Sequence, residues 1–187
     1  PLSWLKEYVD INLSPKELAE KLTEIGLSVE KITKTSDDVI FELEITPNRP
    51  DLLSIIGIAR EIAAIENKKI KFPILKTSLN LRTHLKGVKL IPLTIKTDPK
   101  INPRFNAIII DGIKVRESPD WLKNRLAKIG QRSINNIVDI TNYVMLELGN
   151  PIHAFDYDKI AEHLMTVEKT NGGEKFYYSI FHSIAAF

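Results

Sequence analysis

VIFELEITPNRPDLLSIIGIAREIAAI, residues 39–65, decides the fold of the first part of the chain. Apolar residues recur at every second position from Val39 to Ile45, which predicts a strand. Pro47 and Pro50 then push the residue before each of them out of the helical region. Apolar residues at helical spacing follow and predict a helix over about Leu52–Ile65. The stretch is therefore a strand and a helix joined by a rigid elbow.

Arg49 lies on this elbow, between the two prolines. An arginine held on a rigid backbone can contact a ligand. The alternative, which we favour, is that it pairs with one of the nearby carboxylates, Glu42, Glu44 or Asp51. The carboxylate of Asp51 also lies near the predicted helix start, where negative charge suits the helix dipole.

Two helices are predicted upstream of this strand. Apolar residues within 4–9 have the spacing of one face of a short helix. Ser14 can cap a second helix, Pro15 suits its first position, and Glu17 can complete a capping box. Gly26 is the expected end. The buried stripe of this second helix is predicted to contain Leu18, Leu22 and Ile25.

A lysine-rich and weakly patterned segment, 67–87, follows and contains the expected domain boundary. Residues 88–95 and 104–110 then read as strands, and 113–115 can pair back after the turn at Asp111-Gly112. Two further helices are predicted, from Ser118 to Gly130 and from Ser133 to Gly149.

Strands followed by a helix pair favour an α+β fold. The prediction is a small amino-terminal α+β domain and then a mixed α+β domain. Their expected bounds are 1–71 for the first domain, 72–87 for the linker and 88–187 for the second domain, with 176–187 atypical.

The composition narrows the class of protein. Of the 187 residues, 43% are hydrophobic and 27% are charged, which favours a folded domain with a buried core. The longest apolar runs are far shorter than the roughly 20 residues that a membrane helix needs, so we expect no membrane span. No cysteine is present, which excludes disulfides, thiol nucleophiles and thiolate zinc sites.

Charge is distributed unevenly along the chain. Residues 68–132 carry 16 Lys and Arg against 4 Asp and Glu, although the whole chain has a net charge of only +2. A basic segment of this kind favours an acidic partner such as a nucleic-acid backbone. The alternative is a solvated face with ion pairs between segments.

Candidate site residues gather between Gly130 and Asp156. Arg132 comes just before a predicted helix, and Thr141 and Asn142 interrupt the apolar pattern of that helix. Polar groups at such places must find partners or line a pocket. The turn after Gly149 then directs His153 back toward the end of the same helix.

Two interpretations of His153 stay open. It can satisfy the last carbonyls of the helix, or it can form a polar pocket with Arg132, Thr141 and Asn142. Phosphate loops, dinucleotide-binding glycine motifs, serine elbows and metal-ligand spacings are missing from the sequence. No metal site is therefore predicted.

Three motifs resemble the β subunit of bacterial-type phenylalanyl-tRNA synthetase, in the order in which that family carries them. They are LSWLKEYVD (2–10), ELEITPNRPD (42–51) with GIARE (57–61), and VDITNYVM (138–145) followed by GNPIHAFD (149–156). The resemblance spans roughly residues 2–175.

This resemblance implies a function for each part. Residues from about 88 resemble the start of the family's editing domain, which hydrolyses tyrosine misattached to phenylalanine tRNA. Arg132, Thr141, Asn142 and His153 match residues that line the editing pocket, with Phe155 nearby, and His153 is the expected catalytic residue. The implied partners are phenylalanine tRNA and the α subunit in a cytoplasmic α2β2 enzyme. The α subunit charges tRNA with ATP and magnesium; no cofactor is expected in this segment.

The sequence also departs from the family pattern. The oligonucleotide-binding barrel usual between the first helices and the strand at Phe41 is replaced by a connection at about 33–38. The chain ends inside the expected editing domain, and 176–187 do not resemble it. Two alternatives therefore stay open: a tRNA-binding or subunit-assembly module without hydrolysis, and a truncated relic that only folds.

Overall fold

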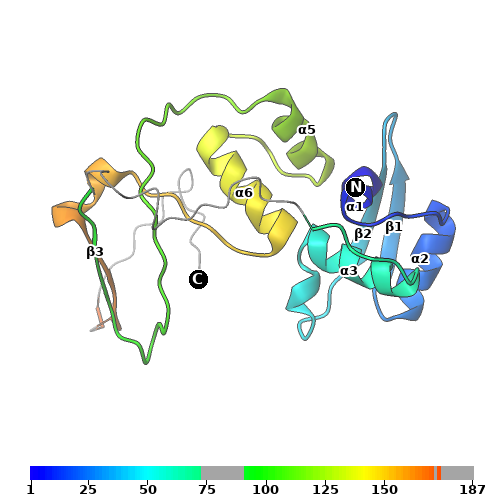
Figure 1. Cartoon of the computed structure of the whole chain (residues 1–187), viewed down its shortest axis with the longest axis horizontal. Coiled ribbons are helices and arrows are strands. Elements are labelled where there is room, and N and C mark those ends of the chain that lie inside the picture. The colour runs from blue at the N-terminus through cyan, green and yellow to red at the C-terminus, as the bar shows by residue number, and fades with distance from the viewer. Residues whose placement is uncertain (73–90, 171, 174–187) are drawn as a thin grey trace. The chain divides into compact units, whose positions relative to one another are not determined.

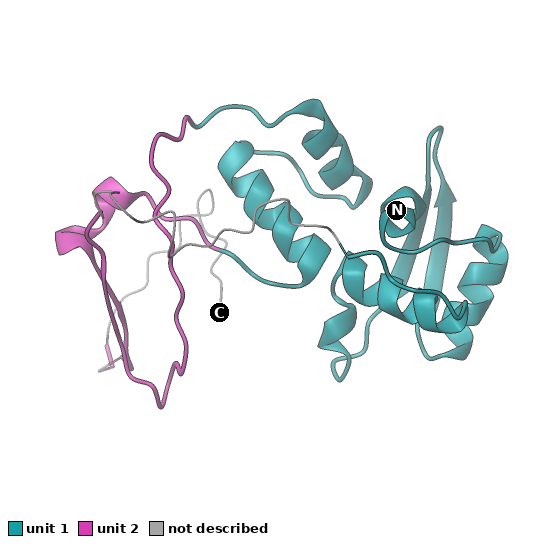
Figure 2. Ribbon diagram, in the orientation of Figure 1, with its two compact units in different colours: residues 1–75, 115–152 teal, residues 76–114, 153–187 magenta. Residues whose placement is uncertain are grey.

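The computed structural model describes residues 1–72, 91–170 and 172–173. Contacts divide the chain into two compact units, each built from two segments (Figure 2). The first unit contains 1–75 and 115–152, and the second contains 76–114 and 153–187. The linker predicted at 72–87 lies almost wholly outside the described residues. The domain bounds drawn from the sequence stay a prediction.

The first two helices form as predicted (Figure 1). Helix α1 spans Leu2–Tyr8, and α2 spans Pro15–Glu24. The hydroxyl oxygen of Ser14 accepts a hydrogen bond from the Glu17 backbone N–H at 3.3 Å, and the Glu17 carboxylate accepts one from the Ser14 N–H at 2.8 Å. This reciprocal pair is the capping box, and it fixes the start of α2.

The predicted stripe of α2 is correct at two of its three positions. Leu18 and Leu22 are buried, but Ile25 is 41% exposed. The physical reason is the end of the helix. Ile25 is the C-cap with φ −90° and ψ 7°, and Gly26 follows with φ +90°, so the chain has already left the helix. The helical spacing therefore no longer places Ile25 on the buried face.

The strand read from the sequence is β2, Val39–Glu44, and it pairs antiparallel with β1, Ser28–Lys34. Ile32 faces Phe41 in this register. The apolar side chains of β2 pack against a core formed by α1, α2 and α3. The buried members of that core include Trp4, Val9, Leu18, Leu22, Leu27, Ala59 and Ile62.

The elbow contains a short turn that the sequence did not predict. Residues Pro50–Leu52 form a 3-10 helix, η1, and α3 begins only at Ile55 and ends at Ile65. The predicted start at Leu52 is wrong because Ser54 caps α3, its hydroxyl accepting from the Gly57 N–H at 3.1 Å. A Cβ on Gly57 would overlap the carbonyl oxygen of Asp51, so η1 folds closely onto α3 at this position.

Arg49 has the structural partners that we favoured. Its guanidinium bonds both carboxylate oxygens of Asp51, at 3.0 and 2.9 Å, and also reaches Glu61 on α3 at 2.7 Å. These bonds raise the pKa of Arg49. Glu61 was not among the predicted partners, and it ties the elbow to the helix that follows.

The two later helices also belong to the first unit. Helix α5 spans Asp120–Lys128, and α6 spans Asn136–Leu148. The cap of α6 is Asn135 and not Ser133, because the Asn135 side chain accepts from the N–H groups of Ile137 and Val138, both at 3.0 Å. Gly149 ends the helix in the left-handed region with φ +75°.

In the second unit, β3 (Thr94–Thr97) pairs parallel with β4 (Leu164–Val167). The predicted strand at 88–95 is therefore confirmed only at its last two residues; 88–90 lie outside the described residues. The strands predicted at 104–110 and 113–115 are wrong, since those residues have no ladder partner within the described part of the chain. A segment of alternating apolar and polar residues forms a strand only where a neighbouring strand accepts and donates its backbone hydrogen bonds.

The fold is mixed α+β, as predicted from the sequence. None of the helices within the described residues is long and apolar enough to span a membrane.

Candidate functional site

Helix α6 carries two of the predicted site residues, Thr141 and Asn142. The Thr141 hydroxyl donates to the carbonyl of Val138 at 2.8 Å and is half-buried. Asn142 is only 5% exposed as a whole residue, and its side-chain amide makes no hydrogen bond to any described residue. An amide carries both donors and an acceptor, so it is the kind of group that can bind a polar ligand.

Arg132 lies in the loop between α5 and α6, three residues before the α6 cap. Its side chain is exposed and pairs with no residue that the structure describes. The positive charge is therefore available to an anionic or hydroxylated ligand.

Asp139 organises this loop, although the sequence did not single it out. Its carboxylate is fully buried in the first turns of α6. One oxygen accepts from the Ile134 N–H at 2.9 Å, and the other accepts from the hydroxyls of Ser118, at 2.5 Å, and Ser133. Burial alone would raise the pKa of Asp139, but these hydrogen bonds outweigh it and keep the pKa below its usual value.

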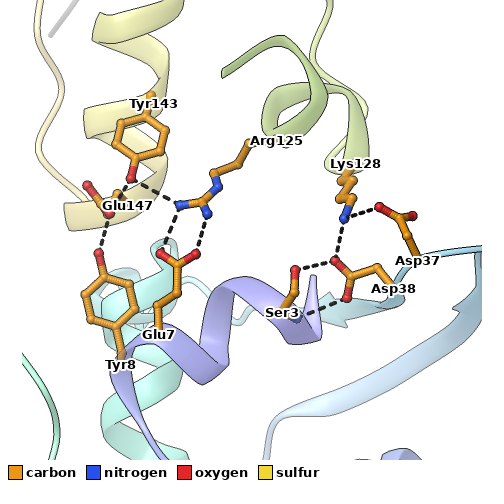
Figure 3. Close-up of polar contacts among 9 residues, drawn as sticks. All are labelled: Ser3, Glu7, Tyr8, Asp37, Asp38, Arg125, Lys128, Tyr143 and Glu147. Carbon is orange, nitrogen blue, oxygen red and sulfur yellow. Dashed lines mark hydrogen bonds and ion pairs between the residues drawn. The ribbon is translucent and has the colours of Figure 1, made fainter. Parts of the chain in front are cut away.

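The opposite end of α6 is held by a second network (Figure 3). Glu147 accepts hydrogen bonds from the phenols of Tyr143, at 2.6 Å, and of Tyr8 on α1. Burial and the bond to Glu147 raise the pKa of Tyr143 to about 12, and the same two causes raise that of Tyr8. Both phenols therefore stay protonated donors near neutral pH.

Helix α5 is joined to α1 and to the hairpin by ion pairs. The guanidinium of Arg125 pairs with Glu7 and lies 4.9 Å from the centre of the Trp4 ring. Lys128 contacts Asp37 at 2.8 Å and Asp38 at 2.9 Å, and Asp38 also accepts from Ser3 (Figure 3). The helix that carries Thr141 and Asn142 is therefore packed in one unit with the amino-terminal elements.

The remaining predicted residues, His153 and Phe155, belong to the second unit. Their rings meet edge to face, with centroids 4.3 Å apart and an interplanar angle of 62°. His153 makes no hydrogen bond to any other described residue, and both interpretations of it stay predictions. His153 and Phe155 thus contact each other in one unit, whereas Arg132, Thr141 and Asn142 belong to the other unit.

Surface grooves and groups of metal-ligating side chains within the described residues are further features that can mark a functional site. A surface groove of about 700 Å³ lies between α2 and β1, and none of the predicted site residues lines it. No group of three or more His, Asp or Glu side chains within the described ranges is arranged to hold a metal ion.

Comparison with known proteins shows which family the chain resembles. Residues 101–179 match the model of the B3/4 domain, and this span contains every predicted site residue. The phenylalanine–tRNA ligase β subunit of Rhodopirellula baltica is 42% identical over 159 residues, which cover 85% of this chain and 23% of that protein.

Two further relatives carry the same name. The β subunit of Fusobacterium nucleatum is 52% identical over 124 residues, covering 66% of this chain and 15% of the relative. The β subunit of Carboxydothermus hydrogenoformans is 42% identical over 152 residues, which cover 81% of this chain and 18% of that protein. The chain spans less than a quarter of the length of these relatives. Over that span, the chain belongs to the phenylalanine–tRNA ligase β-subunit family.

Proposed function

We propose that this chain is the part of a phenylalanine–tRNA ligase β subunit that contributes to hydrolytic editing of tyrosine misattached to phenylalanine tRNA. The observation that carries the proposal is the match of residues 101–179 to the B3/4 domain, together with 42% or higher identity to β subunits. The five candidate residues all lie within that span: Arg132, Thr141, Asn142, His153 and Phe155.

An editing site must recognise the phenol hydroxyl group of tyrosine. Tyrosine differs from phenylalanine by one hydroxyl group, and a site that hydrogen-bonds this group discriminates far better than an apolar pocket does. The side-chain amide of Asn142 supplies a donor and an acceptor on α6, and the Thr141 hydroxyl, which already donates to the Val138 carbonyl, supplies an acceptor. Arg132 provides a charge that can hold the terminal phosphate or ribose of the tRNA.

Hydrolysis of the aminoacyl ester also needs a positioned water and donors for the developing oxyanion. We assign His153 to this role, with Phe155 against its ring to fix the orientation of the imidazole. The sequence contains no Ser–His–Asp or Cys–His arrangement, so we expect direct attack of water without a covalent intermediate.

The rest of the proposal concerns the whole enzyme. We place this chain with an α subunit in a cytoplasmic α2β2 assembly that uses ATP and Mg²⁺ to charge phenylalanine tRNA. The described residues do not fit those two groups, because they hold no metal-ligand cluster and the sequence carries no phosphate loop. No step of editing is therefore assigned to ATP or Mg²⁺.

A second candidate is a tRNA-binding or assembly module without hydrolysis. The excess of Lys and Arg over residues 68–132 favours this candidate, because these side chains can contact the phosphates of tRNA. Binding through phosphate contacts alone is weak and falls steeply as the salt concentration rises. Titration of phenylalanine tRNA at low and high salt measures this binding. Affinity that does not change with salt would exclude it.

Replacement of His153 tests the editing proposal. In a full-length β subunit carrying this sequence, purified with its α subunit, His153→Ala should slow hydrolysis of tyrosyl-tRNA by about 100-fold or more, and phenylalanine charging should stay intact. His163→Ala is the matched control, because His163 stacks on Tyr157 in the same unit and is not assigned to the pocket. An unaltered hydrolysis rate per folded molecule would remove His153 from the site.

A further inference from the structure

We propose that Asp139 is a positioning residue of the editing site, which holds the loop that carries Arg132 against the start of α6. This inference rests on the proposed editing function and adds a residue to it. Asp139 does not contact the substrate in this account. It acts through the backbone on either side of Arg132.

The contacts of the Asp139 carboxylate join three segments at one buried point. Ser133 and Ile134 follow Arg132 directly. The Ile134 N–H donates to one oxygen of the Asp139 carboxylate, and the hydroxyls of Ser133 and of Ser118, just before α5, donate to the other. The carboxylate is 0% exposed, so these protein donors replace water around it. The loop after Arg132 is therefore tied to α6 by Asp139.

Arg132 itself depends on these neighbours. Its side chain has no partner among the described residues. The position of Arg132 therefore depends on the backbone at Ser133 and Ile134, which Asp139 holds. Asp139 is also three residues before Asn142 on the same helix. One carboxylate thus couples the position of Arg132 to that of the helix carrying Thr141 and Asn142.

The helix has other supports that survive the loss of Asp139. Asn135 caps its first turn at 3.0 Å, and Glu147 bonds Tyr143 and Tyr8 near its far end. Loss of the carboxylate is therefore expected to release the loop while leaving α6 in place. This separates a positioning role from a role in folding alone.

The two serines provide a matched pair of variants. Ser133 precedes Ile134 on the Arg132 loop. Ser118 belongs to a loop that is also held by Asn136, whose N–H donates to the Arg116 carbonyl at 2.9 Å and whose side-chain oxygen accepts from the Arg116 N–H at 3.0 Å. Each variant removes one hydroxyl from the same carboxylate oxygen. Ser133→Ala should loosen Arg132, and Ser118→Ala should not.

The test measures steady-state hydrolysis of tyrosyl-tRNA by the full-length synthetase carrying this sequence. Asp139→Asn should lower kcat/KM about 10- to 100-fold, mainly through KM, because a misplaced binding group weakens positioning of the substrate. Ser133→Ala should give a smaller loss in the same direction, and Ser118→Ala should give no loss. Phenylalanine charging should be unchanged in all three.

The decisive comparison combines Asp139→Asn with Arg132→Ala. If Asp139 acts through Arg132, the double variant hydrolyses tyrosyl-tRNA at the rate of Arg132→Ala alone. Losses that multiply would overturn the proposal, and so would equal effects of Ser133→Ala and Ser118→Ala. If Asp139→Asn fails to fold, the same comparison is made with Ser133→Ala.

The proposed function fails in a different way. If Arg132→Ala and His153→Ala both leave hydrolysis unchanged, editing by this site is wrong. If those two variants slow hydrolysis while Asp139→Asn and Ser133→Ala do not, editing stands and the positioning role of Asp139 is wrong.

Discussion

The ring of Tyr143 on α6 stacks on the indole of Trp4 on α1, with centroids 5.2 Å apart and an interplanar angle of 12°. The two residues are 139 positions apart and join the amino-terminal elements to the helix that carries Thr141 and Asn142. The same phenol ring meets Trp121 edge to face at 5.6 Å. Tyr143 therefore contacts both α1 and α5 from α6.

The first prediction concerns the two tryptophans. Trp4 is 1% exposed and Trp121 is 57% exposed, although both contact Tyr143. Trp4→Ala should lower the free energy of unfolding by about 3–5 kcal/mol, because it leaves a cavity in the core. Trp121→Ala should cost less than about 1 kcal/mol. Urea unfolding of the 187-residue chain measures both, and similar losses would show that α1 does not support α6 in this way.

The second prediction concerns Arg125 and its partner Glu7. Replacing Glu7 by Ala removes a partly exposed ion pair, which is worth less than about 1 kcal/mol. Replacing Arg125 by Ala also removes the guanidinium from the Trp4 and Tyr143 rings, 4.9 and 5.9 Å away, so it should cost about 1–2 kcal/mol more.

Added salt distinguishes the two parts of this contribution. The cost of Glu7→Ala should shrink at high ionic strength, whereas most of the cost of Arg125→Ala should remain. Equal costs for the two variants at all salt concentrations would mean that the contacts of Arg125 with the two rings add no stability.

The third prediction uses two glycines with the same backbone conformation. Gly130 ends α5 and Gly149 ends α6, each with φ +75°. Alanine costs about 1–2 kcal/mol at either position, since a Cβ strains the left-handed region. At Gly149, the Cβ would also lie 3.3 Å from Ser54, whereas Gly130 has open space around it. Gly149→Ala should therefore be the more destabilising variant in thermal unfolding; equal losses would contradict the packing of α6 on the start of α3.

The fourth prediction is a pH dependence at Asp38. Burial opposes ionisation of this carboxyl, but hydrogen bonds from Ser3 and Lys128 outweigh it and lower the pKa to about 2. A lowered pKa in the folded state stabilises the protein above the unfolded value of about 3.9, and this contribution is lost as the pH falls toward 2.

The size of this effect follows from the shift. Compared with Asp38→Asn, the chain should lose about 2 kcal/mol of its stability advantage between pH 6 and pH 2. Lys128 stays protonated across that range, so the change reports the carboxyl. Unfolding of the two proteins in denaturant at several pH values measures it, and a constant difference would count against the bonds drawn at Asp38.

Local signals in the sequence predicted local structure well. The capping box of Ser14 and Glu17, the strand at β2 and the glycine ends of α2, α5 and α6 all depend on neighbours within a few residues. The pairing of Arg49 with Asp51 was predictable for the same reason. The start of α3 was missed because η1 and the Ser54 cap competed with an apolar pattern that continued through both.

Long-range pairings could not be predicted. Nothing near Glu7 indicates Arg125, which lies 118 positions away, and nothing near Thr94 indicates a parallel partner at Leu164. The apolar alternation over 104–110 was read as a strand because a pattern does not show whether a partner is present. Asp139 was overlooked although one signal was visible: an aspartate inside an apolar helix must find buried donors.

We propose that this chain contributes to an editing site that recognises tyrosine. The most direct test is the rate at which a full-length synthetase carrying this sequence hydrolyses preformed tyrosyl-tRNA and phenylalanyl-tRNA made with the same phenylalanine tRNA. We predict rapid hydrolysis of the tyrosyl ester, little hydrolysis of the phenylalanyl ester, and loss of this preference in Asn142→Ala and His153→Ala. Equal rates for the two esters, or a preference that both variants retain, would contradict the account.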